Sequence, residues 1–142
     1  MTDERDETLL ESFWDVARQV RKMSMQALAP WDIAPSHARA LGVLMRHGVM
    51  RLSELSDHLN IAPRTATEVV DDLQARGYVE RKPDPHDRRA TLVSVTAEGQ
   101  RVSEAIRSTR TEDAERFFDI LSAADRAHLA RILRKFTRAQ SR

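Results

Sequence analysis

Four polar side chains near the middle of the chain have the chemistry needed to read the edges of DNA bases. They are Arg64, Thr65, Thr67 and Glu68. An arginine can donate to guanine or to a phosphate, and a glutamate can accept from the N4 amino group of cytosine or repel a phosphate. The two threonines add small hydroxyl groups, and no bulky apolar side chain stands in the way. A solvated helix face would carry the same residue types, and the set taken alone favours that simpler interpretation.

Two adjacent arginines, Arg88 and Arg89, form a second candidate site. They belong to segment 83–90, whose two prolines and two aspartates predict a turn. An arginine at the tip of a hairpin can reach into a minor groove when a recognition helix lies beside it. Alternatively, one of the two arginines simply pairs with Asp84 or Asp87.

A pair of short helices is predicted to position the first set. Leucines recur at helical spacing over residues 52–59, and Pro63 suits the first position of a second helix that runs to about Arg76. The apolar face of this second helix is formed by Ala66, Val69, Val70 and Leu73. The candidate base-reading residues lie on the opposite face. Gly77 then fits a left-handed helix end.

Two strands are predicted to position the arginines. Residues 78–82 and 92–96 alternate between apolar and polar side chains on either side of the turn, and residues 50–51 could add a third strand. Two short helices followed by a hairpin predict a winged helix-turn-helix.

The run from Leu52 to Thr96 resembles the MarR family of bacterial transcriptional regulators, and the resemblance extends over nearly the whole chain. Its motifs are Leu-Ser-Glu-Leu from Leu52, Pro-Arg-Thr-Ala-Thr from Pro63, Arg-Gly-Tyr-Val from Arg76, the Asp-rich and Arg-tipped wing over 84–89, and Val-Thr-Ala-Glu-Gly from Val95. The wing followed at once by Val-Thr-x-x-Gly is the most specific of them, because helix pairs are common. In the family pattern an Asp–Arg pair stiffens the wing while an arginine enters the minor groove.

The resemblance implies a mainly α (α+β) fold with a small wing and long terminal helices. It implies one domain over 1–142, in which 33–98 form the DNA-binding lobe while 8–30 and 97–140 form dimerisation helices. The protein is expected to be a homodimeric transcriptional repressor. It would bind double-stranded DNA at a pseudo-palindromic operator and be released by a small aromatic or amphipathic effector. The effector pocket is expected near Trp14, Trp31 and His37. Alternatively, both tryptophans are core or interface residues.

The remaining helices are predicted from residue spacing. They run from Thr8 to just before Pro30, from Pro35 to His47, from Ala97 to about Leu121, and from Ser122 to near the end. Residues 1–7 are expected to fray. Gly42 is expected to allow close packing against another element; alternatively, it lies beside a ligand pocket. The first and last helices carry more apolar surface than a small lobe can cover. Together with the acidic first residues and the basic last helix, this surface predicts a dimer.

Composition excludes several classes of protein. The chain has no cysteine, which rules out disulfides and thiolate chemistry; its five histidines lack metal-ligand spacing, and no catalytic motif is present. The sequence therefore predicts no metal, no cofactor and no enzyme. Without a signal peptide or membrane span, it predicts a cytoplasmic location.

The formal net charge is only +1, and residues 46–101 hold nine basic and nine acidic side chains. This balance favours the rival hypothesis, a winged-helix protein-interaction module that does not bind DNA.

Overall fold

The computed structural model describes residues 4–140, which form a mainly helical fold with one small antiparallel sheet, as predicted. In chain order the elements are α1 (Glu4–Gln26), a 3₁₀ turn (Ala29–Trp31), α2 (Pro35–His47), β1 (Met50–Arg51), α3 (Leu52–Leu59), α4 (Pro63–Ala75), β2 (Val79–Asp84), β3 (Asp87–Val95), α5 (Ala97–Phe118) and α6 (Ala123–Gln140). Within this part of the chain, no helix is both long enough and apolar enough to cross a membrane.

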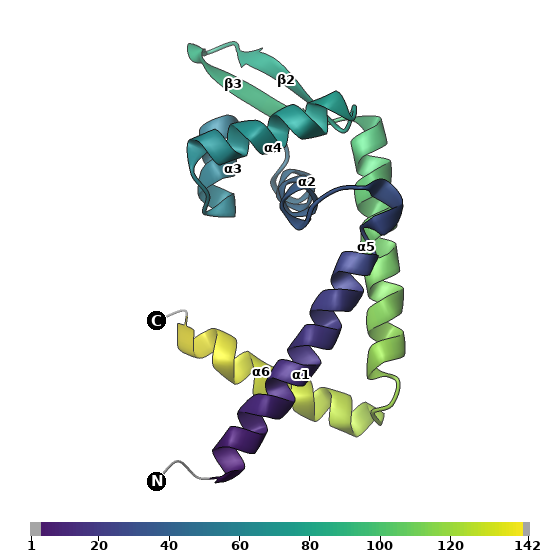
Figure 1. Cartoon of the computed structure of the whole chain (residues 1–142). Helices are drawn as coiled ribbons and strands as arrows, with labels where there is room; N and C mark the ends of the chain where they lie inside the picture. Colours follow the sequence, from purple (N-terminus) through teal and green to yellow (C-terminus); the bar gives the residue numbers. More distant parts are fainter. Residues whose placement is uncertain (1–3, 141–142) are drawn as a thin grey trace.

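The elements fall into a lobe and a set of long helices (Figure 1). The helices α2, α3 and α4 gather with the sheet at one end of the molecule, and α5 leads away from this lobe. Helix α1 lies beside α5, and α6 crosses at the far end, so both chain termini lie away from the lobe. The base-reading candidates and the terminal helices therefore occupy opposite ends of the molecule.

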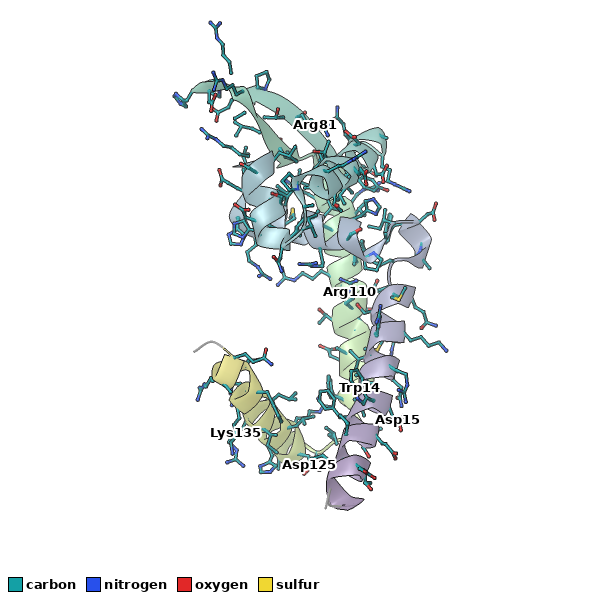
Figure 2. The ribbon with its side chains drawn as sticks, turned by 60° about the vertical axis from the view of Figure 1, so that its left-hand side comes forward. Trp14, Asp15, Arg81, Arg110, Asp125 and Lys135 are labelled. Carbon is teal, nitrogen blue, oxygen red and sulfur yellow. The ribbon has the colours of Figure 1, made fainter. Side chains whose placement is uncertain are left out.

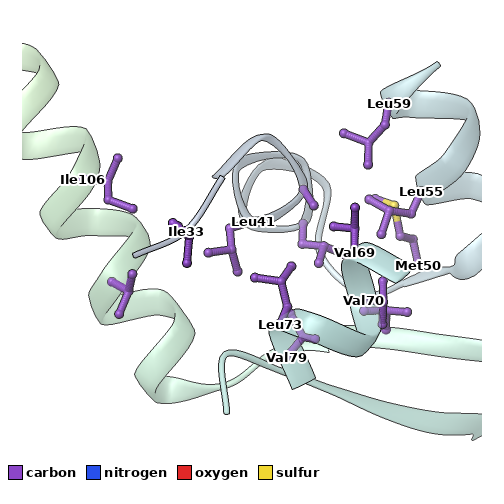
Figure 3. Close-up of a cluster of buried hydrophobic side chains, with 14 of the residues drawn as sticks. Ile33, Leu41, Met50, Leu55, Leu59, Val69, Val70, Leu73, Val79 and Ile106 are labelled. Atoms are coloured by element: carbon purple, nitrogen blue, oxygen red, sulfur yellow. The ribbon is translucent and has the colours of Figure 1, made fainter. Parts of the chain in front are cut away.

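One apolar core holds the lobe together and reaches onto the first half of α5 (Figure 3). The stripe predicted for α4 is buried, with Val70 and Leu73 both 0% exposed. Leu41 of α2 and Leu55 of α3 pack against it, and Ile106 brings α5 into the same cluster. Because α4 is fixed along its whole apolar face, its polar face is held at one orientation to solvent.

The sheet has the strand order β1-β3-β2, which confirms the third strand at residues 50–51. Its hairpin is longer than predicted, since β2 continues to Asp84 and β3 begins at Asp87. Pro83 lies within β2 and was expected to end the strand. Because β2 is an edge strand, a proline can be accommodated there, and the register shifts between Pro83 and Asp84.

Helix α5 is fastened tightly to the lobe at Thr96, the predicted N-cap. The Thr96 hydroxyl accepts from the backbone N–H of Gly99 at 3.1 Å and donates to the carbonyl of Gly77 at 2.6 Å. A Cβ on Gly99 would clash with the backbone carbonyl oxygen of Tyr78, so only glycine fits there. Gly77 has φ +78°, as its predicted role at a helix end requires.

Two expectations were wrong. Helix α1 begins at Glu4 rather than at Thr8, because no glycine or proline interrupts this segment and acidic residues suit a helix N-terminus. The expectation for residues 1–3 lies outside the described residues. Gly42 does not allow a close approach, since a Cβ there would meet nothing within 4 Å. It borders a cavity instead, which agrees with the alternative position beside a pocket.

Candidate nucleic-acid interface

The first turns of α4 carry the predicted base-reading residues. Pro63 occupies the start of the helix, and Arg64, Thr65 and Glu68 are exposed. Thr67 is half-buried, and its hydroxyl donates to the carbonyl of Pro63 at 3.0 Å, which leaves the oxygen able to accept. The structure thus places all four side chains at one helix end, with the arginine and the glutamate free to reach outward.

The turn between α3 and α4 is closed by local backbone geometry. Asn60 adopts a left-handed conformation with φ +53°, and the N–H of Ile61 donates to the carbonyl of Ser56 at 3.1 Å. Arg39 of α2 donates to the carbonyl of Leu59 at 3.1 Å, which satisfies the end of α3. These bonds set the angle at which α4 leaves α3.

Arg81 of β2 joins the wing to α4 (Figure 2). Its guanidinium donates to the carboxylate of Asp71 and to the side-chain oxygen of Gln74, the latter at 2.8 Å, and it reaches the carbonyl of Thr67 at 3.4 Å. The side chain is 25% exposed. Sequence reasoning missed this residue, because strand alternation indicates a face but not a partner on another element.

Asp84 at the base of the wing tip pairs with Arg51 rather than with Arg88 or Arg89. The Asp84 carboxylate is 6% exposed, accepts from Nε of Arg51 at 2.9 Å, and accepts from the backbone N–H of His86 at 2.9 Å. The His86 N–H lowers the pKa of Asp84, burial opposes this by raising it, and the charge of Arg51 lowers it further. An aspartate and an arginine from different strands therefore stiffen the wing.

Arg88 and Arg89 lie exposed at the start of β3, beyond this ion pair. The carboxylate of Asp87 accepts from the backbone N–H of Arg89 at 2.9 Å, not from its side chain. Among the side chains of residues 7–140, no carboxylate forms an ion pair with either guanidinium. The alternative that one of them pairs with Asp84 or Asp87 is therefore wrong: Asp84 pairs with Arg51, and Asp87 accepts from a backbone N–H. Both remain available to an external anion such as a phosphate.

The three residues expected at an effector pocket lie on three different elements. Trp14 lies on α1 and is 54% exposed, Trp31 is half-buried against the core of the lobe, and His37 lies in the first turn of α2. None of them lines the large cavity of the molecule, which has a volume of about 1110 Å³ and lies between α2, α5 and α6.

The cavity has apolar walls and several arginines. Leu41, Phe118 and Leu129 contribute from the three helices, and Arg107 and Arg110 lie along α5. Arg110 donates through Nη2 to the carbonyl of Ser24 at 3.3 Å, while its Nε is buried without a hydrogen-bond partner among residues 4–140. Side chains able to ligate a metal do not form a group of three or more anywhere in the described chain.

Comparison with known proteins identifies the family. The sequence model of the protein family described as "MarR family" matches residues 31–90. An uncharacterised HTH-type transcriptional regulator of Mycobacterium bovis, Mb0904, is 34% identical over 101 residues, which cover 69% of this chain and 71% of that protein. The YusO protein of Bacillus subtilis has the same fold, with a TM-score of 0.86 at 21% identity over 98% of this chain and 99% of that one. A mutant MarR of Escherichia coli complexed with operator DNA is 25% identical, with a TM-score of 0.73 over 95% of this chain and 99% of that one. The chain belongs to the MarR family of helix-turn-helix transcriptional regulators.

Proposed function

We propose that the protein is a homodimeric repressor that binds a pseudo-palindromic operator and is released from it by a small amphipathic molecule. The observation that carries this proposal is the exposed first half of α4, held rigidly beside a wing that ends in two unpaired arginines. A relative of the same fold is complexed with operator DNA. Each α4 would enter a major groove through Arg64, Thr65, Thr67 and Glu68, while Arg88 or Arg89 enters the flanking minor groove.

The terminal helices support the dimer. Helix α1 exposes a row of large apolar side chains: Leu9, Leu10, Phe13, Trp14, Val16 and Val20. Helix α6 exposes Leu133 and Phe136, the latter at 64%. Exposed apolar surface of this extent favours association with another chain. We assign residues 8–30 and 97–140 to dimerisation and 33–98 to DNA binding, with half-sites about 10 base pairs apart.

The cavity between α2, α5 and α6 supports an effector. Its apolar walls suit the body of an amphipathic molecule, and the unpartnered Nε of Arg110 suits an acceptor on it. A volume of about 1110 Å³ lies just above the usual range for a small-molecule pocket, roughly 300–1,000 Å³, and we propose that a second copy covers part of it. Of the three residues that the sequence predicts at the effector, Trp14 alone is largely exposed, and it belongs to the apolar row of α1 that we assign to the dimer. Release requires that the effector binds the non-DNA-binding shape of the dimer more tightly than the other.

The test is fluorescence anisotropy of labelled duplex DNA from immediately upstream of the protein's own gene, measured across a salt series. We expect affinity to fall steeply with salt, because binding releases counterions from the phosphates. Arg64→Ala and the double variant Arg88→Ala/Arg89→Ala should each weaken binding. In the double variant, loss of one phosphate contact per subunit should reduce the log–log salt slope by about 2 per dimer. Arg116→Ala, which removes an exposed arginine on α5 far from the lobe, is the matched control and should bind normally.

The alternative is a protein-interaction module with the same fold. The equal numbers of acidic and basic side chains over residues 46–101 favour it. A mainly apolar protein interface would show little salt dependence, whereas a DNA interface must show it. Absence of DNA binding at low salt, or binding that ignores both sets of substitutions, would make this module the better description.

A further inference from the structure

His37 lies between two elements and uses both nitrogens of its ring. It is the third residue of α2, and its Nδ1 accepts from the backbone N–H of Ala34 at 3.0 Å. Its Nε2 lies 3.2 Å from Oδ2 of Asp72 on α4. Because Nδ1 acts as an acceptor, the ring proton lies on Nε2, which donates to the carboxylate. With both nitrogens engaged and the side chain only 12% exposed, His37 is poorly suited to bind an effector.

The segment that precedes His37 lies along the second half of α4. Arg76, at the end of α4, donates to the carbonyl of Trp31 at 3.5 Å. Ile33 is 8% exposed and belongs to the core that α4 shares, and Trp31 packs against it. This segment belongs to the connector between α1 and α2, residues 27–34. The end of the terminal helix α1 is thus joined to the recognition helix by a few residues and two side-chain bonds.

Two adjacent acids on α4 bond to different neighbours. Asp71 accepts from Arg81 of the wing, and Asp72 accepts from His37 beside the connector. The recognition helix is therefore held on one side by the wing and on the other by the connector. Both contacts lie within the proposed DNA-binding segment of residues 33–98, but His37 lies at its edge, in the first turn of α2 and directly after the connector that leads from α1.

We propose that His37 is a positioning residue: its bond to Asp72 fixes the recognition helix relative to the α1–α2 connector, and operator affinity depends on that bond. The inference rests on the proposed DNA-binding function. The two ring nitrogens of His37 have different roles, because Nδ1 caps α2 while Nε2 bonds to Asp72 of α4. Substitutions can remove the second role and keep the first.

Three variants separate the roles. At the third residue of a helix, both Gln and Glu can accept from the N-cap N–H. His37→Gln can also donate to Asp72, so we expect an operator affinity within about twofold of wild type. His37→Glu keeps the cap but places a carboxylate against Asp72, and should weaken operator binding about tenfold, within the range usual for coupled sites. Adding Asp72→Asn to His37→Glu gives the glutamate a donor, and should restore affinity to within about threefold of wild type.

The operator probe is a duplex selected from a random pool by the wild-type protein, and each variant is also measured on a scrambled duplex. The ratio of the two affinities removes general effects of charge on DNA binding. Asp72→Asn alone still accepts from His37 and should keep the wild-type ratio. Ser36→Glu is the matched control, since it adds the same charge one residue earlier, at an exposed position. Amide hydrogen exchange in the second half of α4 should quicken in His37→Glu and recover in the double variant.

The outcomes are distinguishable. If the wild type selects no duplex, both the proposed function and this inference fail. If the wild type binds but His37→Glu keeps the wild-type affinity ratio, the inference alone fails. The same holds if the double variant stays as weak as the single one, because the defect would then lie in the cap and not in the bond to Asp72.

Discussion

The winged lobe buries its large apolar side chains, whereas the terminal helices leave similar side chains exposed to solvent. In the lobe, Leu55 and Leu73 are 0% exposed, and every helix contributes to one core. On the terminal helices, Phe13 is 56% exposed and Phe136 is 64% exposed, and α6 buries no residue fully. The two regions do not differ in residue type but in whether a packing partner exists within one chain. The lobe buries its apolar side chains with the help of the first half of α5, whereas α1 and α6 leave large apolar side chains exposed.

The largest effect should follow from a change inside the lobe. Leu73→Ala removes buried methyl groups at the contact of α4 with the core and should lower the free energy of unfolding by about 2–5 kcal/mol. Urea denaturation, monitored by circular dichroism, measures this free energy. A loss well under about 1 kcal/mol would mean that the lobe core is as incomplete as the terminal helices.

The junction between the lobe and α5 should be nearly as sensitive. Gly99→Ala places a Cβ against the backbone carbonyl of Tyr78, which cannot move aside cheaply, so we expect destabilisation of about 1–3 kcal/mol. Gly42→Ala is the matched control, because its Cβ would meet nothing within 4 Å and alanine favours the helix by about 1 kcal/mol. The two variants should shift the midpoint of thermal unfolding in opposite directions. A shift in the same direction would contradict the close approach at Gly99.

A charge on the terminal helices should change assembly rather than folding. Phe136→Glu should raise the dimer dissociation constant at least about tenfold, because the exposed ring is proposed to be buried in the dimer. Light scattering after size-exclusion chromatography measures the mass. Val49→Glu is the control, since Val49 is 61% exposed but belongs to the lobe. Equal effects of the two substitutions would remove the distinction between the regions.

The smallest effect concerns the wing and its dependence on pH. The pKa of Asp84 is lowered from 3.8 by the His86 N–H and by Arg51, against the opposing effect of burial. A lowered folded-state pKa means that its contribution to stability is complete above the unfolded value and is lost as pH falls through the folded value. Hydrogen exchange of the wing amides should therefore quicken below about pH 3.8, after correction for intrinsic rates. In Asp84→Asn, this change with pH should vanish while the rest of the lobe keeps its own.

What the sequence could predict followed from local rules. The apolar stripe of α4, Pro63 at its start and Gly77 after its end are signals within one element, and the structure confirms each of them. The partners of Asp71 and Asp84 were missed because they lie on other elements, 10 and 33 residues away. Arg81 and Arg51 look like any exposed strand arginine in the sequence. Gly42 shows the same limit, since a glycine inside a helix does not reveal whether a neighbour or a cavity faces it.

The close contacts at Thr96 and Gly99 mean that α5 and the lobe rotate together. A helix of 22 residues is about 33 Å long, and hydrogen bonds along its axis keep it stiff. A tilt of about 5° at the junction therefore displaces its far end by about 3 Å. Conversely, a displacement of that size at the far end turns the whole lobe, and α4 with it, through the same small angle. In the proposed dimer, a rotation of a few degrees at the far end of each α5 would therefore change the distance between the two α4 helices.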